Sequence, residues 1–463
     1  MSIFARFYGM ATTKDILLAK IRDNGQFSGG EKLKLCLLLS YPAILAQLSF
    51  VLMQYIDTAM VGHLGAAQGA SIGLVSTVMW LMGGFLMAAS DGFSVQVAQR
   101  IGANDFREAR KVLRQSLVSV MLFSAVIAVI GMAISPGLPR WLGGGPDIVK
   151  DSSSYFLLCS VFIPFMQLDW LCAAMLQASG EMKIPSILYM VMCVLDVGFN
   201  YLFIYVLDMG VTGAALGTGA AEVITAIAMM YCLVKRSPEL NLFQDRGSFR
   251  PTRNVLKKAF DISGPMAVQN VLMRGAYIVS TIIVAPLGTI AIAANSFAVT
   301  AESFCYLPGY GIGEAATALI GQSVGAKRKD LAKRFAWTTT FIGMATMGFL
   351  AVLMYIFAGP IMGLLTPDTA VTTLGAKVLR IEAFAELGYA ASIVAYGAFV
   401  GAGDTKVPSI LNLASMWIVR IIPAVFLTRL WGLTGLWICM AVELTVRGIL
   451  FIIRLARGRW LKI

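Results

Sequence analysis

The segment "LCLLLSYPAILAQLSFVLMQYI", residues 35–56, decides the fold of this chain. It carries no charge and is long enough to cross a bilayer, since a membrane helix needs about 20 apolar residues. Asp57 follows it directly. A carboxylate near the centre of a membrane helix costs on the order of 2.5–3.5 kcal/mol. The segment therefore predicts a membrane span whose aspartate needs compensation.

The composition extends this prediction to the whole chain. Of the 463 residues, 58% are hydrophobic and 13% are charged, whereas a soluble protein carries about 25% charged residues. Apolar runs of similar length recur throughout, which predicts an all-α polytopic membrane protein with twelve transmembrane helices. The expected spans are 36–60, 68–91, 113–135, 152–177, 185–207, 211–234, 258–285, 289–313, 335–358, 374–401, 408–428 and 431–454.

The basic residues predict the orientation of these spans. Most Lys and Arg residues lie in the two termini and in every second loop, while the opposite loops hold only Arg140, Lys150 and Arg429. By the positive-inside rule, both termini are expected in the cytoplasm and the protein in the cell's inner (plasma) membrane. The net charge of +12 then meets anionic lipid, and no nucleic-acid partner is expected.

An internal repeat divides the chain into two halves. "DTAMVGHLG" at 57 matches "STIIVAPLG" at 280, "SDGFSVQVAQRIGA" at 90 matches "GEAATALIGQSVGA" at 313, and "SGEMKIPS" at 179 matches "AGDTKVPS" at 402, all with one offset. Parallel repeats predict two six-helix lobes related by a pseudo-twofold axis, with a cleft between them. The expected division is a tail (1–35), an N-lobe (36–234), a basic linker (235–257), a C-lobe (258–454) and a second tail (455–463).

The sequence contains no catalytic constellation, so the chain is not expected to be an enzyme. The seven cysteines are scattered without CxxC spacing, and a single histidine, His63, cannot build a structural metal site with them. "GYGIG" at 309 ends a membrane helix without a preceding strand, so it does not indicate a dinucleotide site. No Walker A motif is present, and no cofactor is expected. For the N-terminal stretch "DILLAKIRD", a membrane-surface helix and a disordered tail both stay open.

Several motifs together resemble the MATE (multidrug and toxic compound extrusion) family over residues 35–455. They are Pro42 with Asp57 fifteen residues later, "QASGEMKIPS" and "GAGDTKVPS" after the fourth span of each half, and "VLDVGFNYLFIY" in the fifth span. The resemblance implies a V-shaped monomer of two lobes that exports organic, cationic, amphipathic compounds. It implies antiport against inward H⁺ or Na⁺ by alternating access.

The resemblance also implies a cation-coupling cluster. The matching positions are Asp57, Asp196, Asn200 and Thr218, with Pro42 as a hinge in the first span. Asp196 and Asn200 are four residues apart and share a helix face. Two neighbouring carboxylates cannot both stay ionised cheaply, so the pair holds a proton or coordinates Na⁺. Many relatives have Asn before Asp at the two fifth-span positions, whereas this chain has the reverse order, which leaves the coupling ion open.

The second half lacks the matching acid, because Ser280 stands opposite Asp57. Its buried charges predict a separate network, with structural pairing or a substrate-sensing role both open; the residues are Arg274, Glu302, Glu382, Glu386 and Arg420. A flippase for lipid-linked precursors of the same superfamily is the first alternative function. A channel or a non-transporting scaffold is the second. The net acidic content of the spans favours cationic cargo over the anionic precursors of a flippase.

Overall fold

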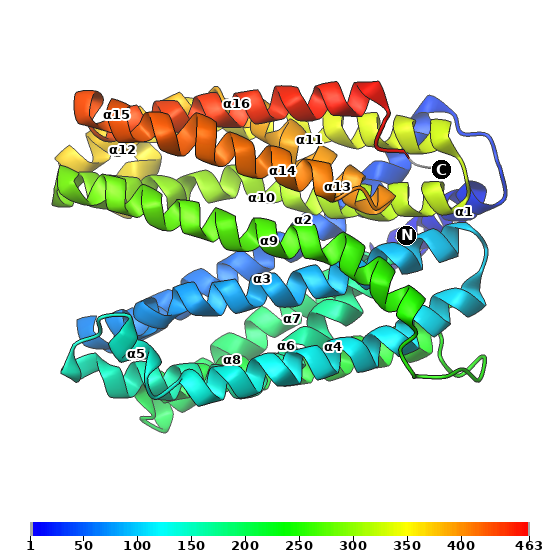
Figure 1. Cartoon of the computed structure of the whole chain (residues 1–463), viewed down its shortest axis with the longest axis horizontal. Helices are drawn as coiled ribbons and strands as arrows, with labels where there is room; N and C mark the ends of the chain where they lie inside the picture. The colour runs from blue at the N-terminus through cyan, green and yellow to red at the C-terminus, as the bar shows by residue number, and fades with distance from the viewer. Residues whose placement is uncertain (1–2, 462–463) are drawn as a thin grey trace. The chain divides into compact units, whose positions relative to one another are not determined.

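The computed structural model describes residues 3–461, and this part of the chain is helical without any strand (Figure 1). The first half contains α1 (Ile3–Arg22), α2 (Gly29–Gly62), α3 (Ala66–Gly102), α4 (Phe106–Ile134), α5 (Leu138–Trp141), α6 (Pro146–Ala178), α7 (Lys183–Asn200) and α8 (Gly210–Tyr231). The second half contains α9 (Arg253–Val284), α10 (Thr289–Gly325), α11 (Lys329–Leu365), α12 (Thr369–Ala383), α13 (Glu386–Ala402), α14 (Lys406–Ala414), α15 (Ile422–Trp431) and α16 (Leu433–Arg457).

The prediction of an all-helical, twelve-span membrane protein is confirmed. Within the described residues, 11 spans are long and apolar enough to cross a membrane as single helices, and the pair α12 and α13 brings the number to 12. This pair is bent by 58° where Ala383 ends one helix and Glu386 begins the next. The span expected as one helix over 374–401 is therefore broken. Both flanking glutamates are buried, so the break lies beside buried charge.

The internal repeat is also present in the backbone. α3 starts at Ala66 and α10 at Thr289, which reproduces the offset of the sequence repeat. Gly180 and Gly403 both take positive φ, at 89° and 80°. Asn104 and Lys327 do the same, at 58° and 59°, although neither is a glycine. Because residues other than glycine rarely adopt positive φ, the shared conformation shows that the two halves have the same local folds.

The helices pack into two compact units. The N-terminal unit is Leu45–Gly264, and the C-terminal unit is Met1–Ile44 with Pro265–Ile463. The expected lobes had their limits in the tail and the linker, whereas the contacts divide the chain within α2 and within α9. Pro42 and Pro265 lie at these two divisions. Each proline lacks a backbone N–H, so each removes one helical hydrogen bond near the point where the chain passes between units.

Close helix contacts hold the first parts of α2 and α9. At Gly311 in α10, a Cβ atom would lie 2.6 Å from the backbone nitrogen of Ile44, so glycine is required where α10 meets α2. In the N-terminal unit, Gln96 of α3 donates a hydrogen bond to the Val255 carbonyl in α9 at 3.2 Å. The first part of α2 therefore belongs to the C-terminal unit, and the first part of α9 belongs to the N-terminal unit.

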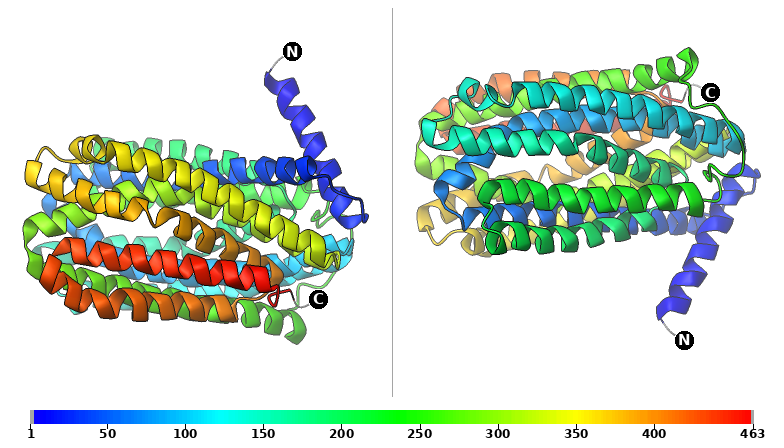
Figure 2. Two further views of the ribbon diagram at one scale, coloured as in Figure 1. Left: turned by 90° about the horizontal axis from the view of Figure 1, so that it is seen from above. Right: turned by 90° about the horizontal axis from the view of Figure 1, so that it is seen from below.

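The N-terminal helix α1 leads away from the bundle (Figure 2). The last turns of α1 pack against protein, because Leu17, Leu18 and Ile21 are buried. Arg328 donates hydrogen bonds to the carbonyls of Lys20 and Gly25, both at 2.8 Å. This end of α1 is thus a helix packed against protein, and the disordered alternative is wrong.

The linker between the halves is bound to α4. Asp245 accepts hydrogen bonds from Arg114 and, at 2.7 Å, from Arg110. Thr252 donates to the Gln115 side chain at 3.0 Å. Burial of Asp245 disfavours its charge, but the two arginines outweigh this effect and hold the pKa of the carboxyl below its ordinary value. The linker is therefore fixed by an ion-pair cluster on one helix.

Candidate functional site

Three helices of the N-terminal unit bring the predicted coupling residues together. Asp57 lies near the end of α2, Asp196 and Asn200 lie one turn apart at the end of α7, and Thr218 lies in α8. A π-helical segment, Tyr201–Val206, follows Asn200 directly. Such segments widen the helix by one residue per turn and occur often at functional sites. Here the segment starts at the cluster.

A single amide bridges the two carboxylates. The Asn200 Nδ2 atom donates to Asp57 Oδ1 at 2.8 Å and to Asp196 Oδ2 at 3.1 Å. Both hydrogens of this amide are thereby used. Thr218 lies beside the Asp196 carboxyl from the neighbouring helix. The structure therefore places all four predicted residues in one cluster.

The cluster is largely closed off and has spare acceptor atoms. Asp196 and Asn200 are fully buried, and Asp57 is half-buried. Asp196 Oδ1 and Asn200 Oδ1 are also buried, and neither accepts a hydrogen bond from any residue between 3 and 461. Buried acceptors without a donor cost about 1–3 kcal/mol each, and more when charged. These oxygens are chemically suited to a proton or a small cation, and binding either would offset that cost.

Gly217 holds the bridging amide in place. A Cβ atom at this position would lie 2.1 Å from Asn200 Oδ1 and 2.9 Å from the Asn200 backbone nitrogen. Only glycine therefore lets α8 approach the end of α7 this closely. Gly217 is therefore a residue that positions the cluster, and it was not among the residues predicted from the sequence. The glycine-rich stretch "GVTGAALGTGAAE" around Gly217 indicates close helix packing. The stretch does not indicate which side chain of the neighbouring helix packs there.

Glu222 is a further acidic residue close to the cluster that was not among the four predicted residues. It follows Thr218 by one helical turn in α8 and is 9% exposed. It lies within electrostatic range of Asp196 and of Asp169 in α6. In the sequence, the spacing of four residues from Thr218 indicates that Glu222 shares a helix face with it. The acidic region of this unit is therefore larger than the four predicted residues.

The predicted hinge, Pro42, lies inside α2. It leaves the Leu38 carbonyl without its helical donor. The division between the units follows two residues later, at Ile44. Pro42 is therefore at the place where α2 passes from the C-terminal unit toward the cluster in the N-terminal unit.

The C-terminal unit has its own group of buried acids. Glu302 of α10, Glu382 of α12 and Glu386 of α13 have carboxylate oxygens within 4.8 Å of one another. Glu382 and Glu386 flank the break between their helices. Neither oxygen of Glu382 accepts a hydrogen bond from the described residues. These three glutamates, here called the glutamate triad, form one compact acidic group.

The arginines predicted to join this group lie at different distances from it. Arg420, which is 8% exposed, stacks over the Tyr277 ring at 5.8 Å and lies within electrostatic range of Glu302 and Glu382. Arg274 lies within electrostatic range of Tyr310. No residue of the described chain forms an ion pair within 4.0 Å with a triad carboxylate. Arg420 is thus the cation that accompanies the triad.

Two comparisons with known proteins agree with this architecture. The chain is 26% identical over 438 residues to "Probable multidrug resistance protein NorM" of Thermotoga maritima, covering 92% of each chain. It is 28% identical over 439 residues to the protein of the same name in Mannheimia succiniciproducens, covering 91% of this chain and 93% of the relative.

The fold is that of solved membrane transporters. The bent form of the Vibrio cholerae MATE transporter VcmN superposes with a TM-score of 0.84 at 19% identity, covering 96% of this chain and 98% of that one. An outward-facing multidrug resistance MATE family transporter of the MOP superfamily superposes with a TM-score of 0.86 at 21% identity, covering 92% and 97%.

The apolar spans and the similarity to the NorM proteins identify a multi-pass membrane transporter. The family assignment rests on the sequence model named MatE, which matches residues 42–202 and 265–426, one match in each half. The chain belongs to the MatE family. The resemblance found from the motifs is thus confirmed.

Proposed function

We propose that the chain is a secondary active antiporter that exports organic, cationic, amphipathic compounds in exchange for H⁺ or Na⁺. The single observation that carries this proposal is the bridge from Asn200 to Asp57 and Asp196 in a largely buried cluster. Membership of the MatE family supplies the transporter class. The proposed protein is a monomer in the plasma membrane, with both termini in the cytoplasm.

The coupling cation binds between Asp57 and Asp196. Two carboxylates that share one amide repel each other when both are ionised, and a proton or Na⁺ relieves this repulsion. The unsatisfied oxygens of Asp196 and Asn200 are suitable ligands for Na⁺, which prefers oxygen, and the Asp196 oxygen is equally suitable for a proton. The same residues therefore support either ion.

Cation binding is coupled to movement of α2. Asp57 is carried by the part of α2 that follows Pro42, and the proline weakens the helix before it. When the cation arrives, the carboxylates draw together and α2 bends near Pro42. The two lobes then rock between access from the inside and access from the outside, and the drug leaves as the cation enters.

The glutamate triad has a supporting role in the C-lobe. Its three buried carboxylates lie together, with Arg420 within electrostatic range, so three acids face one arginine unless protons or a cation neutralise them. A cationic drug lowers the electrostatic free energy of such a group. We assign to the triad and Arg420 a substrate-sensing function, with Arg274 at its margin.

A lipid-linked precursor flippase of the same superfamily is the alternative. Flippases for anionic precursors need arginines or lysines around the substrate, whereas both buried clusters in this chain are acidic. This charge favours cationic cargo. A channel or an enzyme has no comparable support from the described residues.

Everted membrane vesicles test the proposal. Uptake of a fluorescent organic cation is measured with a pH gradient alone, with a Na⁺ gradient alone and with neither. The antiporter concentrates the dye under one of the two gradients, and that gradient identifies the ion. Equilibration without concentration under both gradients contradicts the proposal and favours a channel.

A further inference from the structure

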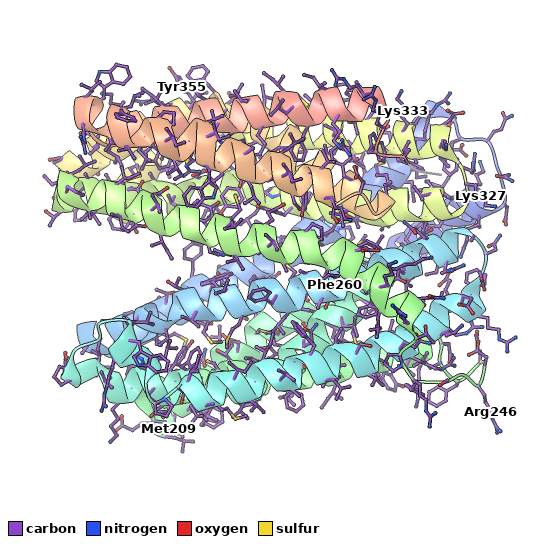
Figure 3. All side chains as sticks on the ribbon, in the orientation of Figure 1. Met209, Arg246, Phe260, Lys327, Lys333 and Tyr355 are labelled. Carbon is purple, nitrogen blue, oxygen red and sulfur yellow. The ribbon has the colours of Figure 1, made fainter. Side chains whose placement is uncertain are left out.

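An open groove of about 640 Å³ lies on the C-terminal unit where α11, α12 and α16 meet. Its apolar wall includes Ile381, Phe384, Ile438 and Val442. Phe384 is 76% exposed and Val442 is 49% exposed, so the groove faces outward. Tyr355 closes one side, with its ring 5.5 Å from that of Phe384. Figure 3 shows Tyr355 at the edge of the ribbon.

Two cationic side chains lie at one end of this groove. Lys377 and Arg380 both line it, and both are exposed. They also line an adjoining groove of about 560 Å³ that continues along α12 past Thr373 to Thr369. The two grooves together have an apolar part, a basic pair and a part with hydroxyl groups. The basic pair and the hydroxyl groups lie on α12, and residues of α11 and α16 complete the apolar part.

The basic pair has no acidic partner in the part of the chain that the structure describes. Arg380 donates only a long hydrogen bond, 3.4 Å, to the Tyr355 carbonyl. Lys377 lies about 12 Å along the helix from its first residue, on a face that meets lipid in a membrane-spanning bundle. An unpaired cation there costs on the order of 2.5–3.5 kcal/mol near the centre of the bilayer and less near the interface. A negatively charged partner from the membrane offsets this cost.

We propose that this groove binds an anionic phospholipid. The phosphate contacts Lys377 and Arg380, the headgroup lies toward Thr373 and Thr369, and one acyl chain occupies the apolar wall. The chemistry of each part matches one part of the lipid. A free phosphate ion does not use the apolar wall, and a zwitterionic lipid brings its own cation beside the basic pair.

The groove also contacts the break between α12 and α13. Phe384 and Ala385, which connect the two helices, both line it. Glu382 and Glu386, which flank the same break, are two of the three buried triad residues. The acyl chain therefore packs on the segment that positions two triad carboxylates. The binding site itself is independent of the proposed transport activity.

Native mass spectrometry of the delipidated full-length protein tests the site. Phosphatidylglycerol and phosphatidylcholine are added separately at equal concentrations, and the affinity for the first bound lipid is measured. Each Lys or Arg near a membrane surface contributes about fivefold to the affinity for anionic lipid. The double variant Lys377→Gln with Arg380→Gln is expected to bind phosphatidylglycerol about 25-fold more weakly.

Matched variants separate the site from general charge effects. Arg140→Gln with Arg429→Gln removes the same charge from two other exposed positions and is expected to bind as wild type does. Val442→Trp fills the apolar wall without changing charge and is expected to weaken phosphatidylglycerol binding as well. If the double variant does not fold, Val442→Trp alone decides.

Three results overturn the proposal. The first is an unchanged affinity for phosphatidylglycerol in the folded double variant or in Val442→Trp. The second is that wild type binds phosphatidylcholine with the same affinity as phosphatidylglycerol. The third is complete displacement of the lipid by millimolar inorganic phosphate. The last result assigns the basic pair to a free anion instead.

Discussion

Asn200 donates its side-chain amide to Asp57 at 2.8 Å, although 143 residues separate them in the chain. The amide joins the end of α7 to α2, and its second hydrogen goes to Asp196. The cluster is therefore organised around a neutral residue that uses all of its donors. Its energetics depend on the amide as much as on the acids.

Replacing Asn200 by leucine removes both hydrogen bonds from the carboxylates. Because the volume is similar and the helix is retained, we expect a folded protein whose two aspartates repel each other without a bridge. Coupled efflux should fall at least tenfold, since about 2 kcal/mol of charge-assisted hydrogen bonding is lost. Efflux in vesicles and the thermal unfolding midpoint measure the two effects. Wild-type efflux in Asn200→Leu would show that the bridge has no part in coupling.

Gly217→Ala places a methyl group against Asn200. The Cβ atom would lie 2.1 Å from the amide oxygen, so α8 and α7 must move apart. Overpacking of this kind costs about 1–3 kcal/mol, and we expect both a lower unfolding midpoint and impaired coupling.

Gly198→Ala is the matched control for that variant. Gly198 lies in α7 two residues before Asn200, and a Cβ atom there meets nothing within 4 Å. Alanine is favoured over glycine in a helix by about 1 kcal/mol, so this variant should be at least as stable as wild type and fully active. Equal effects of the two substitutions would remove the steric argument.

The linker contact gives a pH dependence. The pKa of Asp245 is lowered in the folded protein, so its contribution to stability is present above the ordinary value of about 3.9 and is lost as the pH falls through the lower folded value. Hydrogen-exchange protection of residues 241–246 should therefore fall in acid. Asp245→Asn should lower the hydrogen-exchange protection of this segment at neutral pH by about 2 kcal/mol and remove its acid dependence. Asp147→Asn, at an exposed position, is the control and should leave the protection and its acid dependence unchanged.

The helical fold was predictable from local signals, whereas the four cluster residues were predicted from the resemblance to the MATE family. Apolar length gave the spans, and a constant repeat offset gave the two halves. The role of Gly217 and the bend after Ala383 were not predictable, since each depends on which side chain of a distant helix comes close. The three glutamates of the triad were predicted as members of one network. Their mutual distance was not predictable, because it depends on how α10 packs beside α12 and α13.

Neutralising one triad glutamate should change substrate dependence without unfolding the protein. Glu382→Gln keeps the size of the side chain and removes one of three neighbouring buried charges. We expect an unfolding midpoint at or above that of wild type, together with weaker transport of cationic drugs. Glu181→Gln, in the loop after α6, is the control. A strong loss of stability in Glu382→Gln would indicate a structural charge pair instead.

The most direct measurement is gradient-driven drug efflux by Asp57→Asn in proteoliposomes, compared with wild type under separate pH and Na⁺ gradients. The variant keeps the size of the side chain and removes the charge that the cation neutralises. We predict normal expression and loss of gradient-driven efflux under both ions, while drug exchange without a gradient remains. Full gradient-driven efflux by Asp57→Asn would contradict the assignment of Asp57 as the coupling residue.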